Sequence, residues 1–234
     1  GLEMGGKSPF IVFGDAKITD DLISNAIDSA FWNGGQNCSA NMRQIVHSKV
    51  KEEFLDKILK KVKNIKVGDP LDPETNMGSM ISKKHLATVD GFIQKGIDEG
   101  ATLLYGGVSG NDQKGFFAKP TLFDNLKENM TIARDEIFGP VLGILTVNNT
   151  EDALKIANNS KYGLHASVFT QDINEAFHMA KRLPCGTVSV NTFSEGDIKT
   201  PFGGYKQSGS LSRDQGTEAM NQYLQTKTIW ISHE

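Results

Sequence analysis

The sequence predicts an α/β domain with a largely parallel sheet flanked by helices. Short apolar, β-branched runs recur along the chain, and segments of about ten or more residues with helical periodicity separate them. The length supports this prediction, because 234 residues can bury a sizeable core without disulfide or metal cross-links. Either one large domain or two small ones fits that length.

The apolar runs are expected to form the strands. They cover residues 10–13, 44–47, 101–106, 141–147, 166–170 and 187–191. A further candidate, TKTIWIS at 226–232, is apolar and terminal. These properties suit an edge strand that pairs with something outside the domain.

Capping residues and apolar periodicity predict four helices. Ser48 and Ser82 can each cap a first helical turn, and the two acidic residues after Thr150 favour a helix start there. The predicted helices cover residues 49–65, 82–100, a segment that begins at 150, and 172–183. The glycine-rich stretch at 106–115 lacks the lysine and hydroxyl ending of a phosphate loop, so we expect a surface hairpin there.

Composition excludes several function classes. The net charge of −3 gives no electrostatic footprint for nucleic acid, and no apolar run approaches the ~20 residues that span a bilayer. Two cysteines make no disulfide framework and no secretory leader precedes them, so we expect a reducing, cytoplasmic location. The histidines and cysteines lack metal-ligand spacing, and no metal site is expected.

The segment FWNGGQNCSANMR at 31–43 places Cys38 in a polar turn loosened by glycine. Such a thiol suits a nucleophile, and it equally suits a small buried side chain. The residue types alone leave both interpretations open. Cys185, between a helix end and a strand, is expected to be buried and inert.

Four motifs in order carry a resemblance to a known family. They are LEMGGKSP at 2–9, FWNGGQNCSA at 31–40, EIFGPV at 136–141 and PFGGYKQSG at 201–209. Together they resemble the aldehyde dehydrogenase superfamily along the full chain. The stretches EGDIKTPFGGYKQSG and LQTKTIWIS are similar to the branch that oxidises aminoaldehydes such as γ-glutamyl-γ-aminobutyraldehyde.

The resemblance implies a chemical role for two residues. Cys38 would attack the aldehyde carbonyl, so that hydride can leave toward a nicotinamide and a thioester remains. Glu3 would act as the base that activates water to cleave this thioester. The implied substrates are a small aldehyde and NAD or NADP.

The resemblance also implies binding residues. Glu136 would accept hydrogen bonds from the nicotinamide ribose, and Phe138 and Met4 would lie at the same end of the cofactor. Asn37 and Phe202 would contact the aldehyde, with residues 193–200 lining its entrance. Without the resemblance, a turn cap is the favoured interpretation of Glu136, and a core aromatic that of Phe138.

Family members are longer than this chain, so the resemblance implies an organisation in parts. Residues 1–225 would be the catalytic domain, and the N-terminal half that binds most of the cofactor would lie outside this chain. Residues 226–234 would be an oligomerisation strand that joins copies into a homo-oligomer. The chain alone is then expected to be inactive as a dehydrogenase.

Two other interpretations of Cys38 stay open. One is a thiol hydrolase or acyltransferase that needs no nucleotide, against which stands the lack of a histidine close to Cys38 in sequence. The other is a non-catalytic module that offers its C-terminal strand to a partner subunit.

Overall fold

The computed structural model describes residues 1–109 and 115–233, and a seven-stranded sheet runs through them. The strand order is β3-β4-β5-β2-β1-β7-β8, in which β3 and β4 are antiparallel and all other neighbours are parallel. The strands are β1 (Pro9–Val12), β2 (Arg43–His47), β3 (Thr102–Tyr105), β4 (Thr121–Asp124), β5 (Val141–Val147), β7 (His165–Phe169) and β8 (Thr187–Val190). The predicted fold class, a largely parallel sheet in an α/β domain, is confirmed.

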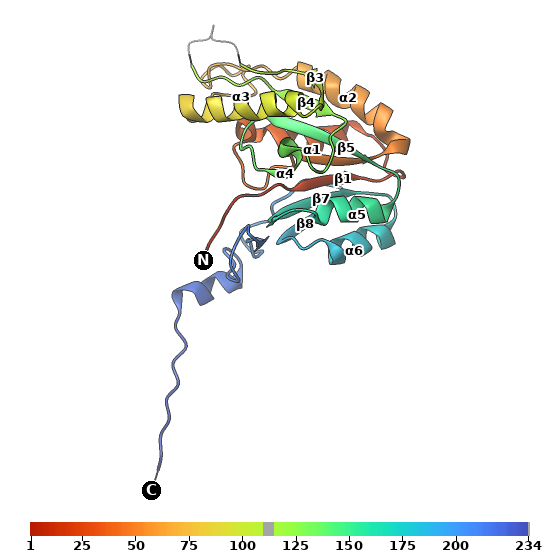
Figure 1. Cartoon of the computed structure of the whole chain (residues 1–234). Coiled ribbons are helices and arrows are strands. Elements are labelled where there is room, and N and C mark those ends of the chain that lie inside the picture. Colours follow the sequence, from red (N-terminus) through yellow and green to blue (C-terminus); the bar gives the residue numbers. More distant parts are fainter. Residues whose placement is uncertain (110–114, 234) are drawn as a thin grey trace.

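Helices cover both faces of this sheet (Figure 1). They are α1 (Asp20–Phe31), α2 (Lys51–Lys63), α3 (Lys83–Asp98), α4 (Thr131–Arg134), α5 (Thr150–Asn158) and α6 (Ile173–Arg182). Adjacent strand residues point to opposite faces, so Phe10 joins the apolar cluster under α1 and α2 while Ile11 joins the cluster under α3 to α6. Burial on both faces explains why the strands read as continuous apolar runs.

Shorter elements complete the domain. A small antiparallel sheet pairs β6 (Tyr162–Gly163) with β9 (Tyr205–Lys206). Three 3-10 helices, η1 (Trp32–Gly35), η2 (Ser48–Val50) and η3 (Thr217–Tyr223), lie in the connections and near the C-terminus of the described chain.

The structure confirms the predicted strands from 10–13 to 187–191 to within one residue at each end. Ser82 is the N-cap of α3, and its hydroxyl accepts the His85 N–H at 3.1 Å. The prediction of Ser48 as a cap was wrong: a 3-10 turn starts there, and the His47 imidazole accepts the Lys49 N–H instead. The hairpin predicted over 106–115 falls partly on 110–114, outside the described residues.

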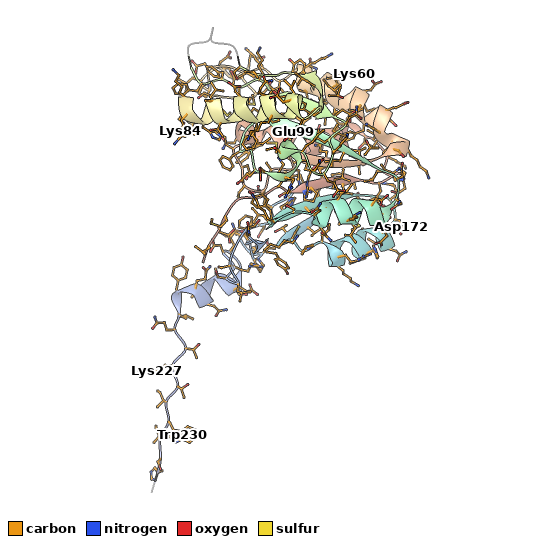
Figure 2. All side chains as sticks on the ribbon, in the orientation of Figure 1. Lys60, Lys84, Glu99, Asp172, Lys227 and Trp230 are labelled. Carbon is orange, nitrogen blue, oxygen red and sulfur yellow. The ribbon has the colours of Figure 1, made fainter. Side chains whose placement is uncertain are left out.

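Residues 224–233 extend away from the domain as neither helix nor strand (Figure 1). Lys227 and Trp230 stand along this extension in Figure 2. Ile229, Trp230 and Ile231 are 73%, 91% and 80% exposed. The strand expected at 226–232 therefore forms no ladder within the described chain, and its pairing with another subunit stays a prediction. None of the described helices is long and apolar enough to cross a membrane.

Candidate active site

The loops that carry the predicted site residues meet at the amino edge of the sheet. Glu3 precedes β1, Cys38 precedes β2, and Glu136 precedes β5. Because β1, β2 and β5 are parallel and adjacent, the segments that enter them lie side by side. The topology thus brings together motifs that are far apart in sequence.

A glycine pair joins Cys38 to Glu136. The Gly6 N–H donates to Glu136 Oε1 at 3.1 Å. A Cβ atom at Gly5 would overlap the Glu136 carboxylate, and one at Gly6 would overlap the Cys38 carbonyl. The backbone can approach both residues only because it carries no side chain there.

The turn before Cys38 is also set by backbone conformation. Asn33, Gly34 and Gly35 have φ values of 52°, 64° and 70°, in the left-handed region. A Cβ at Gly35 would overlap the Gly139 carbonyl, so this turn packs directly on the loop that follows Glu136. Asparagine and glycine tolerate this conformation better than other residues, which explains the WNGG sequence.

The Cys38 thiol is half-buried, and its environment opposes ionisation. Burial raises the pKa of Cys38, and the negative charges of Glu195 and Glu136 raise it further. The backbone N–H groups of Cys38 and Ser39 favour the thiolate and lower the pKa in part. Within this chain alone, the thiol form is therefore favoured.

Glu195 lies beside Cys38. Its Oε1 accepts a hydrogen bond from Asn37 Nδ2 at 2.8 Å and another from the Ser39 hydroxyl. The family resemblance implies that residues 193–200 line the substrate entrance, but no motif in the sequence points to this glutamate in particular. Asn37 is thus at the predicted site, held by a carboxylate 158 residues away in sequence.

Glu3 is tied to the C-terminal part of the domain. It forms an antiparallel bridge with Gly209, and partial burial and the Asp214 carboxylate raise its pKa, while Arg213 lowers it. No hydrogen bond joins the Glu3 and Cys38 side chains among the described residues. The structure therefore places the predicted base on the same edge of the sheet as the predicted nucleophile, with no hydrogen bond between these two described side chains.

The other predicted residues divide between these two regions. Phe138 is 38% exposed and has φ of 56°, which is strained for a bulky residue, and its carbonyl accepts His85 Nε2–H at 2.6 Å. Met4 donates its N–H to the Ser208 carbonyl at 2.8 Å. Phe202 exchanges backbone hydrogen bonds with Asp214 at 2.7 and 2.8 Å. Phe138 thus lies near Glu136, whereas Met4 and Phe202 lie in the region of Glu3.

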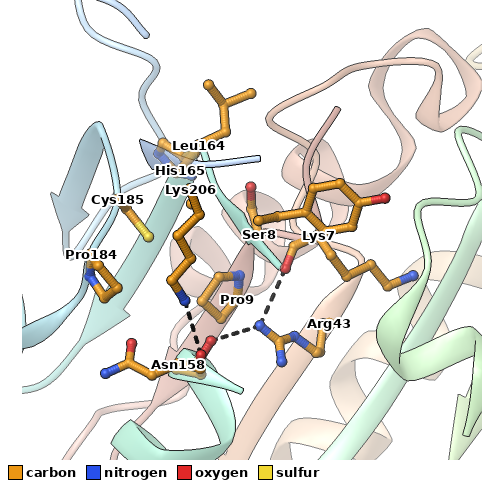
Figure 3. Close-up of a pocket in the computed structure, with 13 residues that line it drawn as sticks. Lys7, Ser8, Pro9, Arg43, Asn158, Leu164, His165, Pro184, Cys185 and Lys206 are labelled. Atoms are coloured by element: carbon orange, nitrogen blue, oxygen red, sulfur yellow. Dashed lines mark hydrogen bonds between the residues drawn. The ribbon is translucent and has the colours of Figure 1, made fainter. Parts of the chain in front are cut away.

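A separate buried cluster surrounds Cys185 (Figure 3). Arg43 Nη2 donates to the Lys7 carbonyl at 3.3 Å and to the Ala157 carbonyl at 2.9 Å, and Lys206 Nζ donates to the Asn158 carbonyl at 3.0 Å. Burial lowers the pKa of Lys7 to about 7 and raises that of Cys185 to about 11. A thiol with such a pKa stays protonated at neutral pH, which fits the inert role expected for Cys185.

Comparison with known proteins decides the family. The sequence pattern of the aldehyde dehydrogenase family matches residues 1–229. The chain belongs to the aldehyde dehydrogenase family. The resemblance inferred from the four motifs is thereby confirmed.

Individual aldehyde dehydrogenases support the assignment. Aminoacetaldehyde dehydrogenase of Pseudomonas aeruginosa is 38% identical over 230 residues, 98% of this chain and 46% of that protein. Betaine aldehyde dehydrogenase of Brucella melitensis is 41% identical over 234 residues, 98% of this chain and 47% of that protein. The solved structure of an aldehyde dehydrogenase of Bacillus cereus in complex with NAD+ has a TM-score of 0.94 at 41% identity and covers all of this chain and 47% of that one. The chain therefore spans about half the length of these relatives.

Proposed function

We propose that this chain is the thiol-bearing catalytic part of an NAD(P)-dependent aldehyde dehydrogenase. The observation that carries the proposal is the junction at Gly5 and Gly6, which joins the Cys38 loop to Glu136 at the amino edge of the sheet. Residues 1–225 would form the catalytic domain. Residues 226–234 would form the oligomerisation strand.

Cys38 is the proposed nucleophile. The thiol loses its proton to solvent, the thiolate sulfur adds to the aldehyde carbon, and the negatively charged oxygen of the resulting tetrahedral adduct accepts a hydrogen bond from the backbone N–H of Cys38. A nicotinamide, when bound, accepts hydride from this carbon. The thioester that remains on Cys38 is then cleaved by water, which releases the acid and the free thiol.

Glu3 is the proposed base for this cleavage. A carboxylate accepts a proton from water more readily when its pKa is raised toward neutrality, and partial burial and Asp214 both raise the pKa of Glu3. Arg213 opposes this effect. The balance between these neighbours sets how strong a base Glu3 is.

The residues at the Glu136 loop fit the nicotinamide end of a dinucleotide. Glu136 uses Oε1 for the Gly6 N–H, and its Oε2 accepts no hydrogen bond among the described residues, so it is available to ribose hydroxyls. The partly exposed Phe138 ring offers an apolar surface beside it. We propose NAD as the cofactor, with most of it held by protein outside these 234 residues.

The proposed substrate is an aldehyde that carries an amino group. Two relatives are named for aminoacetaldehyde and for betaine aldehyde, both of which hold a nitrogen near the carbonyl. A nucleotide-free thiol hydrolase has less support. His165, which is buried, donates its Nε2–H to the Ser194 carbonyl at 3.0 Å, and no described histidine bonds to Cys38.

The C-terminal segment is the proposed contact with a second copy. Residues 226–232 are extended, apolar and exposed, and β8 is an edge of the main sheet with a free side. Pairing of this segment with a neighbour's sheet edge would bury both. The cytoplasmic location also stays a prediction.

The test compares the two cysteines in the intact polypeptide that carries this chain. Cys38→Ala should abolish aldehyde-dependent NADH formation, because the covalent intermediate cannot form. Cys185→Ala, the matched control, should keep most activity, since it removes only a small packed thiol. Substantial aldehyde oxidation by the Cys38→Ala protein would overturn the mechanism.

A further inference from the structure

We propose that the Glu195 carboxylate selects aldehydes that carry a short, positively charged amine, by binding the ammonium group while the carbonyl reaches Cys38. This inference rests on the proposed function and adds to it the residue that would determine specificity. The argument depends on where Glu195 is held, which of its atoms is free, and which charges surround it.

Glu195 is fixed in place beside the thiol. Its Oε1 accepts hydrogen bonds from Asn37 and Ser39, the two residues on either side of Cys38. The backbone that carries it is anchored as well: the Phe193 N–H donates to Asn25 Oδ1 at 2.6 Å. A charge held by such contacts is preorganised to bind a ligand.

The second carboxylate oxygen of Glu195 is available. No hydrogen bond or ion pair engages Oε2 among the described residues, and the side chain is only partly buried. No described lysine or arginine neutralises Glu195. An ammonium group can therefore bind Oε2 without displacing an existing partner.

The surrounding charges favour a cation at this position. Glu136 adds a second negative charge that acts on Cys38. His165, whose Nε2–H donates to the carbonyl of Ser194 next to Glu195, is neutral at physiological pH because burial lowers its pKa to about 4. The field at the thiol is thus negative, which attracts ammonium groups and repels aldehydes that carry a carboxylate.

The position of Glu195 also limits the substrate's length. Because the carboxylate bonds to the immediate neighbours of Cys38, an ammonium group on Oε2 lies close to the sulfur. Only a short chain between amine and carbonyl places both ends correctly. A longer aminoaldehyde would have to fold back or leave Glu195 unpaired.

Cation binding should also assist the chemistry. The negative charge of Glu195 raises the pKa of Cys38. An ammonium group on Glu195 offsets that charge and so favours the thiolate at the moment when the carbonyl is in reach. A neutral aldehyde of the same shape gives no such assistance.

The first experiment uses Glu195→Gln in the intact polypeptide, since glutamine keeps an acceptor oxygen for Asn37 and Ser39 but removes the charge. Oxidation of aminoacetaldehyde is compared with that of propanal, an uncharged molecule of similar shape. We expect kcat/KM for aminoacetaldehyde to fall about tenfold or more, and that for propanal to rise. The control Glu53→Gln removes an exposed carboxylate from an ion pair with Lys57 on α2 and should leave both values unchanged.

An equal fall in kcat/KM for both substrates would show that Glu195 has only a structural role, and it would overturn the proposal. Unchanged preference for aminoacetaldehyde would overturn it as well. Glu195→Asp, which restores the charge at a shorter reach, should recover part of the preference.

The second experiment does not depend on dehydrogenase activity. In a Cys185→Ala background, Cys38 is labelled with methanethiosulfonates that carry either a trimethylammonium or a sulfonate group. The ratio of cationic to anionic labelling rates should fall about tenfold in Glu195→Gln and stay constant in Glu53→Gln. In the intact polypeptide, an unchanged ratio overturns the cation site even if the protein is an active dehydrogenase, whereas a changed ratio without any NADH formation supports the site and overturns the proposed function.

Discussion

The Cys38 thiol shows how strongly one residue depends on its immediate neighbours. Burial and two carboxylates favour the protonated form, and two backbone N–H groups favour the thiolate. The opposing contributions mean that a modest change in local charge alters the thiolate fraction. A bound cation, or a dinucleotide placed beside Glu136, would make such a change. If Cys38 is the nucleophile, as proposed, we expect its thiolate to form mainly when the site is filled.

Replacing Glu3 by Gln should separate the two halves of the reaction. The amide cannot take a proton from water, so the thioester on Cys38 should accumulate and a burst of NADH should precede slow turnover. Rapid-mixing absorbance and mass spectrometry of the intact protein measure the burst and the acyl group. Asp214→Asn, which removes a charge that raises the Glu3 pKa, should make Glu3 a weaker base without abolishing turnover. A wild-type steady-state rate for Glu3→Gln would mean that another group activates the water.

Lys7 should make stability depend on pH. Burial lowers its pKa in the folded chain from 10.5 to about 7, so between these values the unfolded chain binds more protons. The free energy of unfolding should therefore rise with pH across this window and fall as the pH drops toward 7. Lys7→Met should flatten this slope and stabilise the chain at pH 7.

Urea unfolding of the chain between pH 7 and pH 9 measures the effect of Lys7. Most of this range lies below 9.0, the value from which burial raises the pKa of Cys185 to about 11, and the contribution of Cys185, which has the opposite sign, develops mainly above pH 9. Lys84→Met, an exposed position on α3, is the control and should keep the wild-type slope. If the free energy of unfolding depends on pH equally in Lys7→Met and the wild type, the lowered pKa of Lys7 is contradicted.

The family resemblance carried by the four motifs led to the prediction that Cys38, Asn37 and Glu136 belong to one site, whereas the residue types alone left other interpretations open. The motifs did not point to Glu195. Its link to Asn37 spans 158 positions and depends on the return of the chain after β8, which no local pattern encodes. The role of Gly5 and Gly6 as a tight junction also becomes visible only when their neighbours in space are known.

At the scale of elements, α3 connects helix capping to the candidate site. Ser82 Oγ caps the helix by accepting the His85 N–H, and the His85 imidazole donates to the Phe138 carbonyl at 2.6 Å. The cap therefore orients the His85 side chain, which in turn holds the Phe138 backbone in its positive-φ conformation. A substitution at Ser82 should therefore affect the conformation of the loop that carries Glu136, and it should do so through His85.

Ser82→Ala should lower the free energy of unfolding by about 1 kcal/mol, the usual cost of removing a capping side chain. Thermal or urea unfolding measures it. Thr88→Ala on the same helix is the control: its exposed hydroxyl bonds the Lys84 carbonyl, and its removal should change stability by less than about 0.5 kcal/mol. Equal effects of the two substitutions would argue against the cap.

Element predictions succeeded where the pattern was long or strongly apolar, as for β5 and α3. They missed α1, although Thr19 caps it and two acidic residues open it. That capping signal is present in the sequence. They also missed β4, whose four residues lie between a proline and a turn and give too short a pattern to recognise.

At the scale of the whole molecule, strand order decides where the chemistry lies. Alternating strands and helices predicted the fold class, but nothing in their spacing gave the order β3-β4-β5-β2-β1-β7-β8. It is this order that sets β1, β2 and β5 side by side and gathers three distant motifs at one edge. The resemblance to a family supplied the motif set, and the fold supplies the reason why these motifs act together.

The last prediction concerns assembly. Residues 226–232 expose Ile229, Trp230 and Ile231 on an extended segment, and β8 offers an unpaired edge. Exposed apolar strands of this kind tend to pair with other chains.

Sedimentation of the 234-residue chain should show oligomers, whereas a chain that ends at residue 225 should be monomeric at the same concentration. Trp230→Lys should weaken the association in the full chain, and Lys227→Ala, its control, should not. Both chains should form no NADH from aldehyde, because hydride transfer needs a cofactor held in place, an effect that can contribute ~7–11 kcal/mol. A monomeric full chain, or oligomers that persist after truncation, would refute assembly through this segment.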